Sequence, residues 1–277
     1  MFNSSGKPLL MGILNVTPDS FSDGGRFNTI TAALSQAEKM LIDGVDIIDI
    51  GGESTRPYSL SVSSGEQVQR VIPIVKAIRS QLSTTVQISI DTRLSTVAKL
   101  ALSEGANIIN DISAGHNDPT ILKVAADYNC PIILMHIKGT PQTMQDNPAY
   151  EDVVADVIDS LQLSVERAKQ AGINPDKIVL DPGIGFGKTF EHNLKLLAQL
   201  NRFVELGYPI LLGTSRKKFL NTLTATEKPE DLAIATSVTT ALAVMAGVKI
   251  LRVHDVKENR QALDIAWAIK QATIDSE

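Results

Sequence analysis

Residues 11–25 read MGILNVTPDSFSDGG, an apolar run that turns abruptly polar at Asn15. The run is continuously apolar rather than alternating with polar residues, which is typical of a parallel strand covered on both faces. The residues after it bring an amide, two acids and a pair of glycines into one loop. A buried strand that ends in a polar loop is therefore the unit to look for elsewhere in the chain.

Eight such apolar runs occur along the chain. They are Leu9–Leu14, Asp46–Ile50, Val86–Ile90, Asn107–Ile109, Pro131–Met135, Lys177–Leu180, Pro209–Leu212 and Lys249–Val253. Between most of them apolar residues recur at helical spacing, as from Ile30 to Leu41, where the pattern stops at Gly44. Eight strand-then-helix units predict an α/β fold, a (β/α)₈ TIM barrel. A doubly wound open sheet is the alternative, but the barrel fits the count better.

Two prolines mark helix boundaries. Pro73 interrupts a helical pattern and predicts a kink or a late helix start there. The tripeptide Asn117-Asp118-Pro119 predicts a helix that begins with a capping residue and a proline in its first turn.

Length and composition limit the classes of protein to consider. The chain has 277 residues with 43% hydrophobic content and no linker-like segment, which predicts a single domain over residues 1–277. A net charge of −5 argues against nucleic-acid binding. No signal-like or membrane-spanning run is present, so we expect a cytoplasmic protein without membrane contact. The single cysteine, Cys130, precedes an apolar run and is interpreted as a core residue.

Polar residues stand at the end of every apolar run. They are Asn15, Asp49 with the loop GGESTRP, Asp91, Asn110 with Asp111, His136, Asp181, Ser215 with Arg216 and Lys217, and His254 beside Arg252. One such residue is ordinary turn chemistry. In a barrel, however, the carboxyl ends of all strands meet at one face, so eight sets predict one polar cavity.

The residue types indicate what this cavity binds. Carboxylates and an amide suit the N–H donors of a flat heterocycle such as an aminopyrimidinone, and the candidates are Asp91, Asn110 and Asp181. Cationic groups suit a phosphate or carboxylate, and the candidates are Lys217, Arg252 and His254. A turn at Asp181-Pro182 and a surface ion pair of Arg252 are the plain structural alternatives.

The stretch DPGIGFGKT, residues 181–189, approaches the pattern of a phosphate-binding P-loop. Pro182 stands where that motif requires its first glycine, so we do not favour the P-loop. We expect instead that Gly183, Gly185 and Gly187 let the backbone approach a flat ligand closely.

Eight strings, in order, carry a resemblance to a known family. They are GILNVTPDSFSDGG, DIIDIGGESTRP, SIDT, IINDISAG, MHIKGTPQTMQ, LDPGIGFGK, GTSRK and RVHDV. With these, the chain resembles the dihydropteroate synthases along nearly its whole length. The resemblance implies a folate-pathway transferase that joins a dihydropterin pyrophosphate to p-aminobenzoate, and homodimers formed through barrel helices.

The resemblance also implies roles for particular residues. Those that would bind the pterin are Asp91, Asn110, Asp181 and Lys217. Those that would bind the pyrophosphate are Arg252, His254 and Asn15, the last through Mg²⁺ as the single protein ligand of the metal. Those that would bind p-aminobenzoate are Thr55, Arg56, Phe186 and Ser215. The catalytic set would be Asp91, Lys217, Arg252 and His254.

No nucleophile with an adjacent base is evident, so we expect a dissociative substitution rather than covalent catalysis. A cationic pterin methylene would react with water, so the loops after the first two strands should close over the site. The segment NVTPDSFSDGG would then be a lid anchored at Asn15.

Three residues depart from the family pattern: Val45, Tyr58 and Gln142. Tyr58 follows the TRP triplet where glycine is common, and Gln142 stands where a basic residue is common; both could alter loop motion. Two other functions stay open at this point. A pterin-dependent methyltransferase disagrees with GGESTRP and SRK, which serve the aminobenzoate side. A catalytically silent pterin-binding barrel disagrees with Asn15, Arg252 and His254.

Overall fold

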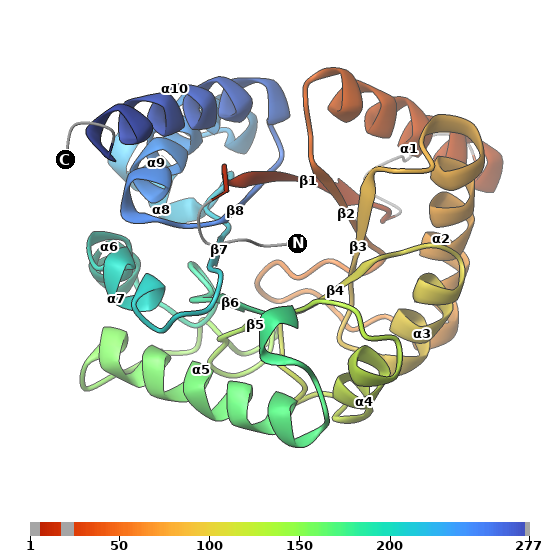
Figure 1. Cartoon of the computed structure of the whole chain (residues 1–277), viewed down its shortest axis with the longest axis horizontal. Helices are drawn as coiled ribbons and strands as arrows, with labels where there is room; N and C mark the ends of the chain where they lie inside the picture. The colour runs from red at the N-terminus through yellow and green to blue at the C-terminus, as the bar shows by residue number, and fades with distance from the viewer. Residues whose placement is uncertain (1–5, 18–24, 275–277) are drawn as a thin grey trace.

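The computed structural model describes residues 6–17 and 25–274, in which eight strands form one parallel sheet (Figure 1). The strands are β1 (Leu9–Asn15), β2 (Ile47–Gly51), β3 (Gln87–Asp91), β4 (Ile108–Asp111), β5 (Ile132–Met135), β6 (Ile178–Asp181), β7 (Leu211–Leu212) and β8 (Ile250–Val253). Their order in the sheet is β6-β5-β4-β3-β2-β1-β8-β7. A bridge between Leu180 and Ile210 joins the two end segments, and this closes the sheet. The predicted TIM barrel is confirmed, and the open sheet is wrong.

Helices surround the barrel on all sides (Figure 1). Within the described ranges they are α1 (Gly25–Ile42), α2 (Ser64–Ala77), α3 (Ser95–Ser103), α4 (Thr120–Asp127), α5 (Val153–Gln170), α6 (Phe190–Ala198), α7 (Leu200–Val204), α8 (Lys218–Thr224), α9 (Ala233–Ala246) and α10 (Val256–Ile274). The connections after β6 and β7 each hold two helices instead of one. None of the helices in these ranges is long and apolar enough to cross a membrane.

The strands end later than the apolar runs predict. Asn15, Asp91, Asp111 and Asp181 are the last residues of their strands rather than the first residues of loops. Each continues the register of the parallel ladder, as Asp91 does opposite Asn110. Backbone pairing continues because it is independent of side-chain polarity. These side chains are consequently fixed by the sheet.

The proline predictions had different outcomes. α2 begins at Ser64, where the Ser63 hydroxyl caps it by accepting the Glu66 N–H at 3.3 Å, so a late start at Pro73 is wrong. The predicted helix near Asn117–Pro119 is confirmed as α4, which begins at Thr120. The Asp118 carboxylate accepts the Thr120 N–H at 3.1 Å, as a capping side chain does.

Successive strand residues point alternately into and out of the barrel. Outward residues such as Ile48 and Ile50 pack against the helices in the larger core. Inward residues form a smaller core that fills the barrel, made of Met11, Ile47, Ile108, Ile133, Val179, Leu211 and Ile250. Cys130 is buried in the outer core, as predicted, and burial raises the pKa of its thiol to about 11. The thiol is therefore a packing residue.

Candidate active site

Polar residues form the layer directly above the inner apolar core. Each of these residues either lies two positions after an inward apolar residue of its own strand or pairs in register with a residue that does. Because side chains alternate between the two faces of a strand, all of them point toward the barrel axis. The buried members are Asp49, Ser89, Asp91, Asn110 and Asp181, and Arg252 is partly buried beside them. We call the end of the barrel that carries them the carboxyl edge, and the opposite end the amino edge.

Arg252 links the acids of this layer. Its Nε donates to Asp49 Oδ2 at 2.7 Å and its Nη2 donates to Asp91 Oδ2 at 2.7 Å. Asn110 Nδ2 donates to the same Asp49 oxygen at 3.1 Å. Burial opposes the charge of Arg252, but Asp49 and Asp91 outweigh it and raise the pKa of the guanidinium. Burial raises the pKa of Asp91 to about 7 despite the opposing charge of Arg252.

Asp49 is the charged residue of this layer that the sequence analysis left without a role. It is fully buried, and its Oδ1 has no hydrogen-bond partner among the described residues. The signal was available in the run Ile47-Ile48-Asp49-Ile50, because a single acid on the inward face of a buried strand demands a cationic partner. Its bonds to Arg252 and Asn110 show that it orients two predicted ligand-binding groups.

Asp181 and Lys217 form the other charged part of the site. Burial raises the pKa of Asp181, with Lys217 as the main opposing charge. Burial lowers the pKa of Lys217 to about 7, and Asp181 opposes that shift. The Lys217 ammonium donates to the Ile184 carbonyl and lies 4.6 Å from the ring centroid of Phe186. Asp181 and Lys217 thus lie close to each other, and Arg252 is a charged neighbour of both.

The glycines of the loop after β6 serve the protein backbone more than a ligand. A Cβ at Gly183 would lie 1.9 Å from the His136 carbonyl oxygen, and one at Gly187 would lie 2.7 Å from that of Lys138. Both glycines have positive φ, at +68° and +66°. Only at Gly185 would the Cβ meet a site residue, Lys217 Cδ at 3.1 Å. The expectation that all three glycines make room for a ligand is therefore corrected for Gly183 and Gly187.

A buried pair of basic residues braces the same loop. Lys188 Nζ lies 2.9 Å from His136 Nδ1 and donates to the Phe186 carbonyl at 2.9 Å. Burial is the main reason that the pKa of Lys188 falls well below its ordinary value and that of His136 falls to about 3. Sequence reasoning had not assigned Lys188, which stands in the motif GFGK.

Ser215 and His254, which follow the neighbouring strands β7 and β8, are in direct contact. The Ser215 hydroxyl accepts the His254 N–H at 3.1 Å and lies 3.0 Å from His254 Nδ1. Burial, followed by the charges of Arg216, Arg252, Arg56 and Lys217, lowers the pKa of His254 to about 3. The imidazole is therefore neutral at pH 7. Asp255 pairs with Arg216 at 2.5 Å, so the surface pairing of Arg252 considered from the sequence is wrong.

The segment between β2 and α2, residues 52–63, is called loop 2 here. It carries Thr55, which is partly exposed, and Arg56, which is exposed. Tyr58 has φ +64° and is exposed, and its N–H donates to the Pro141 carbonyl at 2.9 Å. The left-handed backbone explains why a glycine suits this position. Of the other departures, Val45 is buried in the outer core and Gln142 is exposed.

Asn15 ends β1 next to Gly51, which ends β2. A Cβ at Gly51 would lie 3.6 Å from Asn15 Oδ1 and 3.7 Å from Asp91 Oδ2, so the amide and the carboxylate flank the same glycine. Among the described residues, no group of three or more His, Cys, Asp and Glu could hold a metal ion. The predicted lid falls largely on residues 18–24, which lie outside the described residues.

Comparisons with known proteins identify the family of this chain. The profile of the pterin binding enzymes matches residues 11–254. A dihydropteroate synthase from Synechocystis is 45% identical over 97% of this chain and 92% of its own. The one from Bacillus subtilis is 47% identical over 91% of this chain and 85% of its own.

Solved structures are equally similar. The Yersinia pestis dihydropteroate synthase with a sulfonamide drug has a TM-score of 0.90 at 42% identity and covers 97% of this chain and 96% of its own. The Xanthomonas albilineans enzyme in complex with 7,8-dihydropteroate has a TM-score of 0.87 at 38% identity, covering 97% and 95%. The fold and site define a pterin-binding barrel enzyme. Within that class, the chain belongs to the dihydropteroate synthase family.

Proposed function

We infer that the protein condenses 6-hydroxymethyl-7,8-dihydropterin pyrophosphate with p-aminobenzoate and forms 7,8-dihydropteroate and pyrophosphate, a step of folate biosynthesis. The observation that carries this inference is the layer of buried acids around Arg252 at the carboxyl edge, with Lys217 and Phe186 beside it. Acids and cations in one buried layer suit a substrate that has a heterocycle with N–H donors at one end and an anion at the other.

The pterin is bound by Asp91, Asn110 and Asp181. One oxygen of Asp181 accepts the Gly183 N–H at 2.7 Å, which fixes the carboxylate plane. An ionised carboxylate at this position accepts hydrogen bonds from the ring edge, and these bonds favour its charged form against the burial that raises its pKa. Lys217, whose pKa is about 7, lies close enough to Asp181 that its charge also favours the ionised form of that carboxyl.

The pyrophosphate is bound by Arg252 and His254, with Asn15 on the same side. In the described structure Arg252 uses Nε and Nη2 for Asp49 and Asp91, so these acids hold its guanidinium plane in place. His254 is neutral because of burial and four nearby cations. A bound polyanion opposes those cations and raises the pKa of His254, so the histidine gains affinity for a proton as the leaving group binds.

Mg²⁺ fits this site only as part of a metal–pyrophosphate complex. One amide oxygen, that of Asn15, is the protein donor, and Mg²⁺ commonly keeps several waters and takes substrate phosphate oxygens as ligands. When bound, the ion would neutralise charge on the pyrophosphate. The residues of this chain would orient the complex from the Arg252 and His254 side.

The reaction is a dissociative substitution. The bond between the pterin methylene and the pyrophosphate oxygen breaks with its electron pair on oxygen, where Arg252 and His254 stabilise the charge. The Asp91 carboxylate faces the cationic pterin, and the arylamine nitrogen then attacks the methylene and loses a proton. Thr55, Arg56, Ser215 and Phe186 hold the p-aminobenzoate. Loop 2 excludes water while the cation exists.

Purified protein incubated with both substrates and Mg²⁺ should form dihydropteroate, and omission of either substrate should abolish it. p-Aminobenzoate should bind tightly only after pyrophosphate is present, because the first ligands complete the aryl site. Equal p-aminobenzoate affinity with and without pyrophosphate would contradict this order. The relatives favour this reaction over methyl transfer and over a silent barrel.

We also propose a homodimer formed through α9 and α10, and a cytoplasmic location. Exposed apolar residues recur on α9 at helical spacing, namely Ile234, Val238, Leu242 and Met245, and Ile265 adds to them on the adjoining α10. A stripe of this kind marks an interaction surface, and a second copy of the same stripe matches it in length and character. Light scattering should give a dimer mass, and Leu242→Lys should shift it to the monomer.

A further inference from the structure

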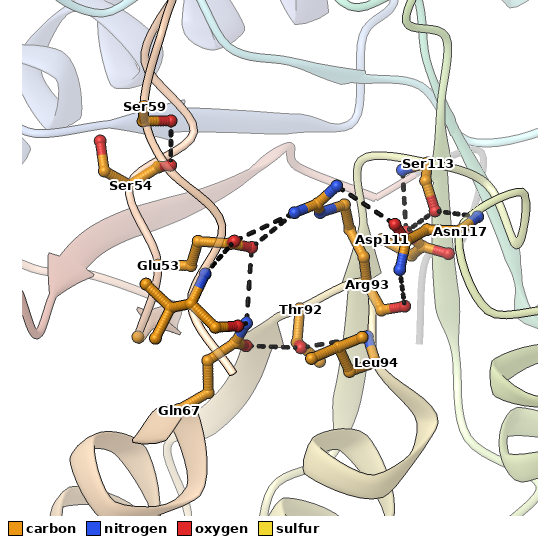
Figure 2. A network of polar contacts seen from close by, with 12 residues as sticks. Glu53, Ser54, Ser59, Gln67, Thr92, Arg93, Leu94, Asp111, Ser113 and Asn117 are labelled. Atoms are coloured by element: carbon orange, nitrogen blue, oxygen red, sulfur yellow. Dashed lines mark hydrogen bonds and ion pairs between the residues drawn. The ribbon is translucent and has the colours of Figure 1, made fainter. Parts of the chain in front are cut away.

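A buried ion pair closes the base of loop 2. Glu53 is buried, and its two carboxylate oxygens accept from Arg93 Nη2 at 3.0 and 2.9 Å (Figure 2). One of them also accepts the Val62 N–H at 2.9 Å, and the other accepts from Gln67 Nε2 at 3.4 Å. Glu53 and Val62 stand near the two ends of loop 2. The Glu53 carboxylate therefore joins both ends of the loop to Arg93, in the connection that follows β3.

The same network reaches the pterin side of the site. Gln67 is buried at the start of α2, and its Oε1 accepts the Thr92 hydroxyl at 3.0 Å (Figure 2). Thr92 directly follows Asp91, and its oxygen also accepts the Leu94 N–H at 3.2 Å. The backbone that carries Asp91 is therefore tied to the base of loop 2 through side chains.

Arg93 extends the network to the connection after β4. Its Nη1 donates to Asn117 Oδ1 at 3.3 Å, and the Asn117 N–H donates to the Ser113 hydroxyl at 3.2 Å. Ser113 in turn donates to Asp111, the last residue of β4, at 2.7 Å. One guanidinium thus connects the segments that follow three neighbouring strands.

Beyond its base, loop 2 is held mainly by bonds within itself, including the Arg56 N–H to the Ser54 hydroxyl at 3.4 Å and the Ser59 N–H to the Arg56 carbonyl at 3.2 Å. The Ser59 hydroxyl donates to the Ser54 carbonyl at 2.6 Å, and the tip bonds to Pro141 through the Tyr58 N–H. Thr55 and Arg56 lie between these points. Their placement is consequently set by where the base of the loop is fixed.

We propose that Glu53 and Arg93 are positioning residues that hold loop 2 so that the p-aminobenzoate half of the site is assembled beside Asp91. A buried ion pair contributes little net stability compared with apolar packing, but removing one partner leaves an uncompensated charge. The role of the Glu53–Arg93 pair is therefore to fix the position of loop 2. The inference rests on the proposed condensation reaction.

The test compares Arg93→Lys and Glu53→Gln with the wild-type protein. Lysine keeps the charge but cannot reach Glu53 and Asn117 together, and glutamine keeps an oxygen for the Val62 N–H. At saturating pterin pyrophosphate we expect the KM for p-aminobenzoate to rise roughly tenfold in each variant. The Kd of 6-hydroxymethylpterin, measured by calorimetry, should change less than about twofold.

The matched control is Asp46→Asn at the amino edge. Asp46 pairs with Arg260 at 3.1 Å and accepts the Leu10 N–H at 2.7 Å, so this pair also ties a connection to a neighbouring strand. We expect this variant to lower Tm without changing the KM for p-aminobenzoate. The double variant Glu53→Gln/Arg93→Lys should raise that KM no more than the worse single variant, because both changes break one interaction.

A lowered Tm with unchanged KM in the folded variants would overturn the proposal, as would an equal loss of pterin affinity. If Glu53→Gln does not fold, Arg93→Lys and its KM decide the question. Absence of dihydropteroate from the wild-type reaction would overturn the proposed function, and this inference with it.

Discussion

The acids in the ion pairs at the carboxyl edge of the barrel are more deeply buried than the acids in the pairs at the amino edge. Asp49 and Glu53 have side chains 0% and 7% exposed in their pairs with Arg252 and Arg93. At the amino edge, Asp46 and Asp264 are 35% and 47% exposed in their pairs with Arg260. The guanidinium groups differ little, because the side chains of Arg252, Arg93 and Arg260 are 19%, 14% and 17% exposed, so the contrast lies in the acids.

The difference teaches what each edge is for. At the amino edge the acid of each pair is partly exposed, so the pair contributes little to stability and water can replace a lost partner. A buried carboxylate and its partner cannot be separated without a large penalty, so their positions are fixed before a ligand arrives. Substitutions at the carboxyl edge should therefore change ligand binding and turnover, whereas matched substitutions at the amino edge should change stability alone.

The largest expected effect follows from Arg252→Lys. Lysine keeps the charge but loses the planar fork that Asp49 and Asp91 now orient. We expect kcat to fall by roughly one to three orders of magnitude, with a smaller change in the KM for the pterin substrate, because the interaction strengthens in the transition state. Steady-state assays measure this.

The matched control is Arg260→Lys, where the guanidinium pairs with Asp46 and Asp264 at the amino edge. We expect normal kcat and a modestly lowered Tm. A normal kcat in Arg252→Lys would remove that residue from the leaving-group site and erase the contrast between the edges.

Asp181→Asn should weaken pterin binding. The amide keeps an oxygen for the Gly183 N–H, so the loop is preserved, but it cannot accept both N–H groups of the ring edge. Loss of one buried charged hydrogen bond should cost about 2 to 3 kcal/mol. Calorimetry with 6-hydroxymethylpterin measures the loss, and Asp46→Asn serves as the amino-edge comparison. Unchanged affinity in Asp181→Asn would refute the assignment of the pterin pocket.

The two edges should also differ in their response to pH. Asp91 has its pKa raised from 3.8 to about 7, so between these values the folded protein holds a proton that the unfolded chain has released. Its contribution to stability therefore falls as pH rises through 7. Urea unfolding should show Asp91→Asn gaining stability relative to wild type between pH 5 and pH 8.

Asp264 provides the opposite sign. Burial opposes its ionisation, but hydrogen bonds from Lys7 and Arg260 outweigh burial and lower the pKa of the carboxyl. Its stabilising contribution is present above the ordinary value of 3.8 and is lost only at lower pH. The stability difference between Asp264→Asn and wild type should be constant from pH 5 to pH 8. If the stabilities of Asp91→Asn and Asp264→Asn relative to wild type changed with pH in the same way, the contrast between the two edges would be wrong.

The smallest expected effects concern backbone conformation. Tyr58 in loop 2 has φ +64°, so Tyr58→Gly removes backbone strain in the folded protein. Glycine also adds freedom to the unfolded chain, so the net gain in unfolding free energy should not exceed ~1 kcal/mol.

Gly44 at the amino edge has φ +88°, and a Cβ there would lie 3.1 Å from Arg260 Cδ. Gly44→Ala should cost about 1 to 2 kcal/mol. Urea denaturation compares both, and a loss in Tyr58→Gly would contradict this account.

Much of the site could be predicted from the chain. The order of apolar runs predicted the barrel, and the polar residues at their ends proved to be Asp91, Asn110, Asp181 and Arg252 on one inner layer. Parallel strands bring equivalent ends together whatever the connections between them, so this prediction needed no distances. The roles of these residues stay predictions, and so do those of Thr55, Arg56 and Asn15.

Other features could not be predicted, since local patterns of residues do not decide them. Pro73 lies inside α2 rather than before it, because the helix already begins where the Ser63 hydroxyl caps it. Two glycines of the loop after β6 make room for a neighbouring backbone, which a local pattern does not reveal. The short β7, and the division of each connection after β6 and β7 into two helices, likewise do not follow from the helical spacing in those segments.

The sequence by itself determined the fold class and the edge that carries the polar residues, because the apolar runs and the polar residues at their ends are local properties of the chain. Only the tertiary structure decided which acid each arginine pairs with. Arg252 pairs with acids more than 160 positions away rather than with nearby Asp255, and Arg93 pairs with Glu53 forty positions before it. Closure of the barrel sets the distances across its axis and between its loops, and burial makes each resulting pair expensive to break.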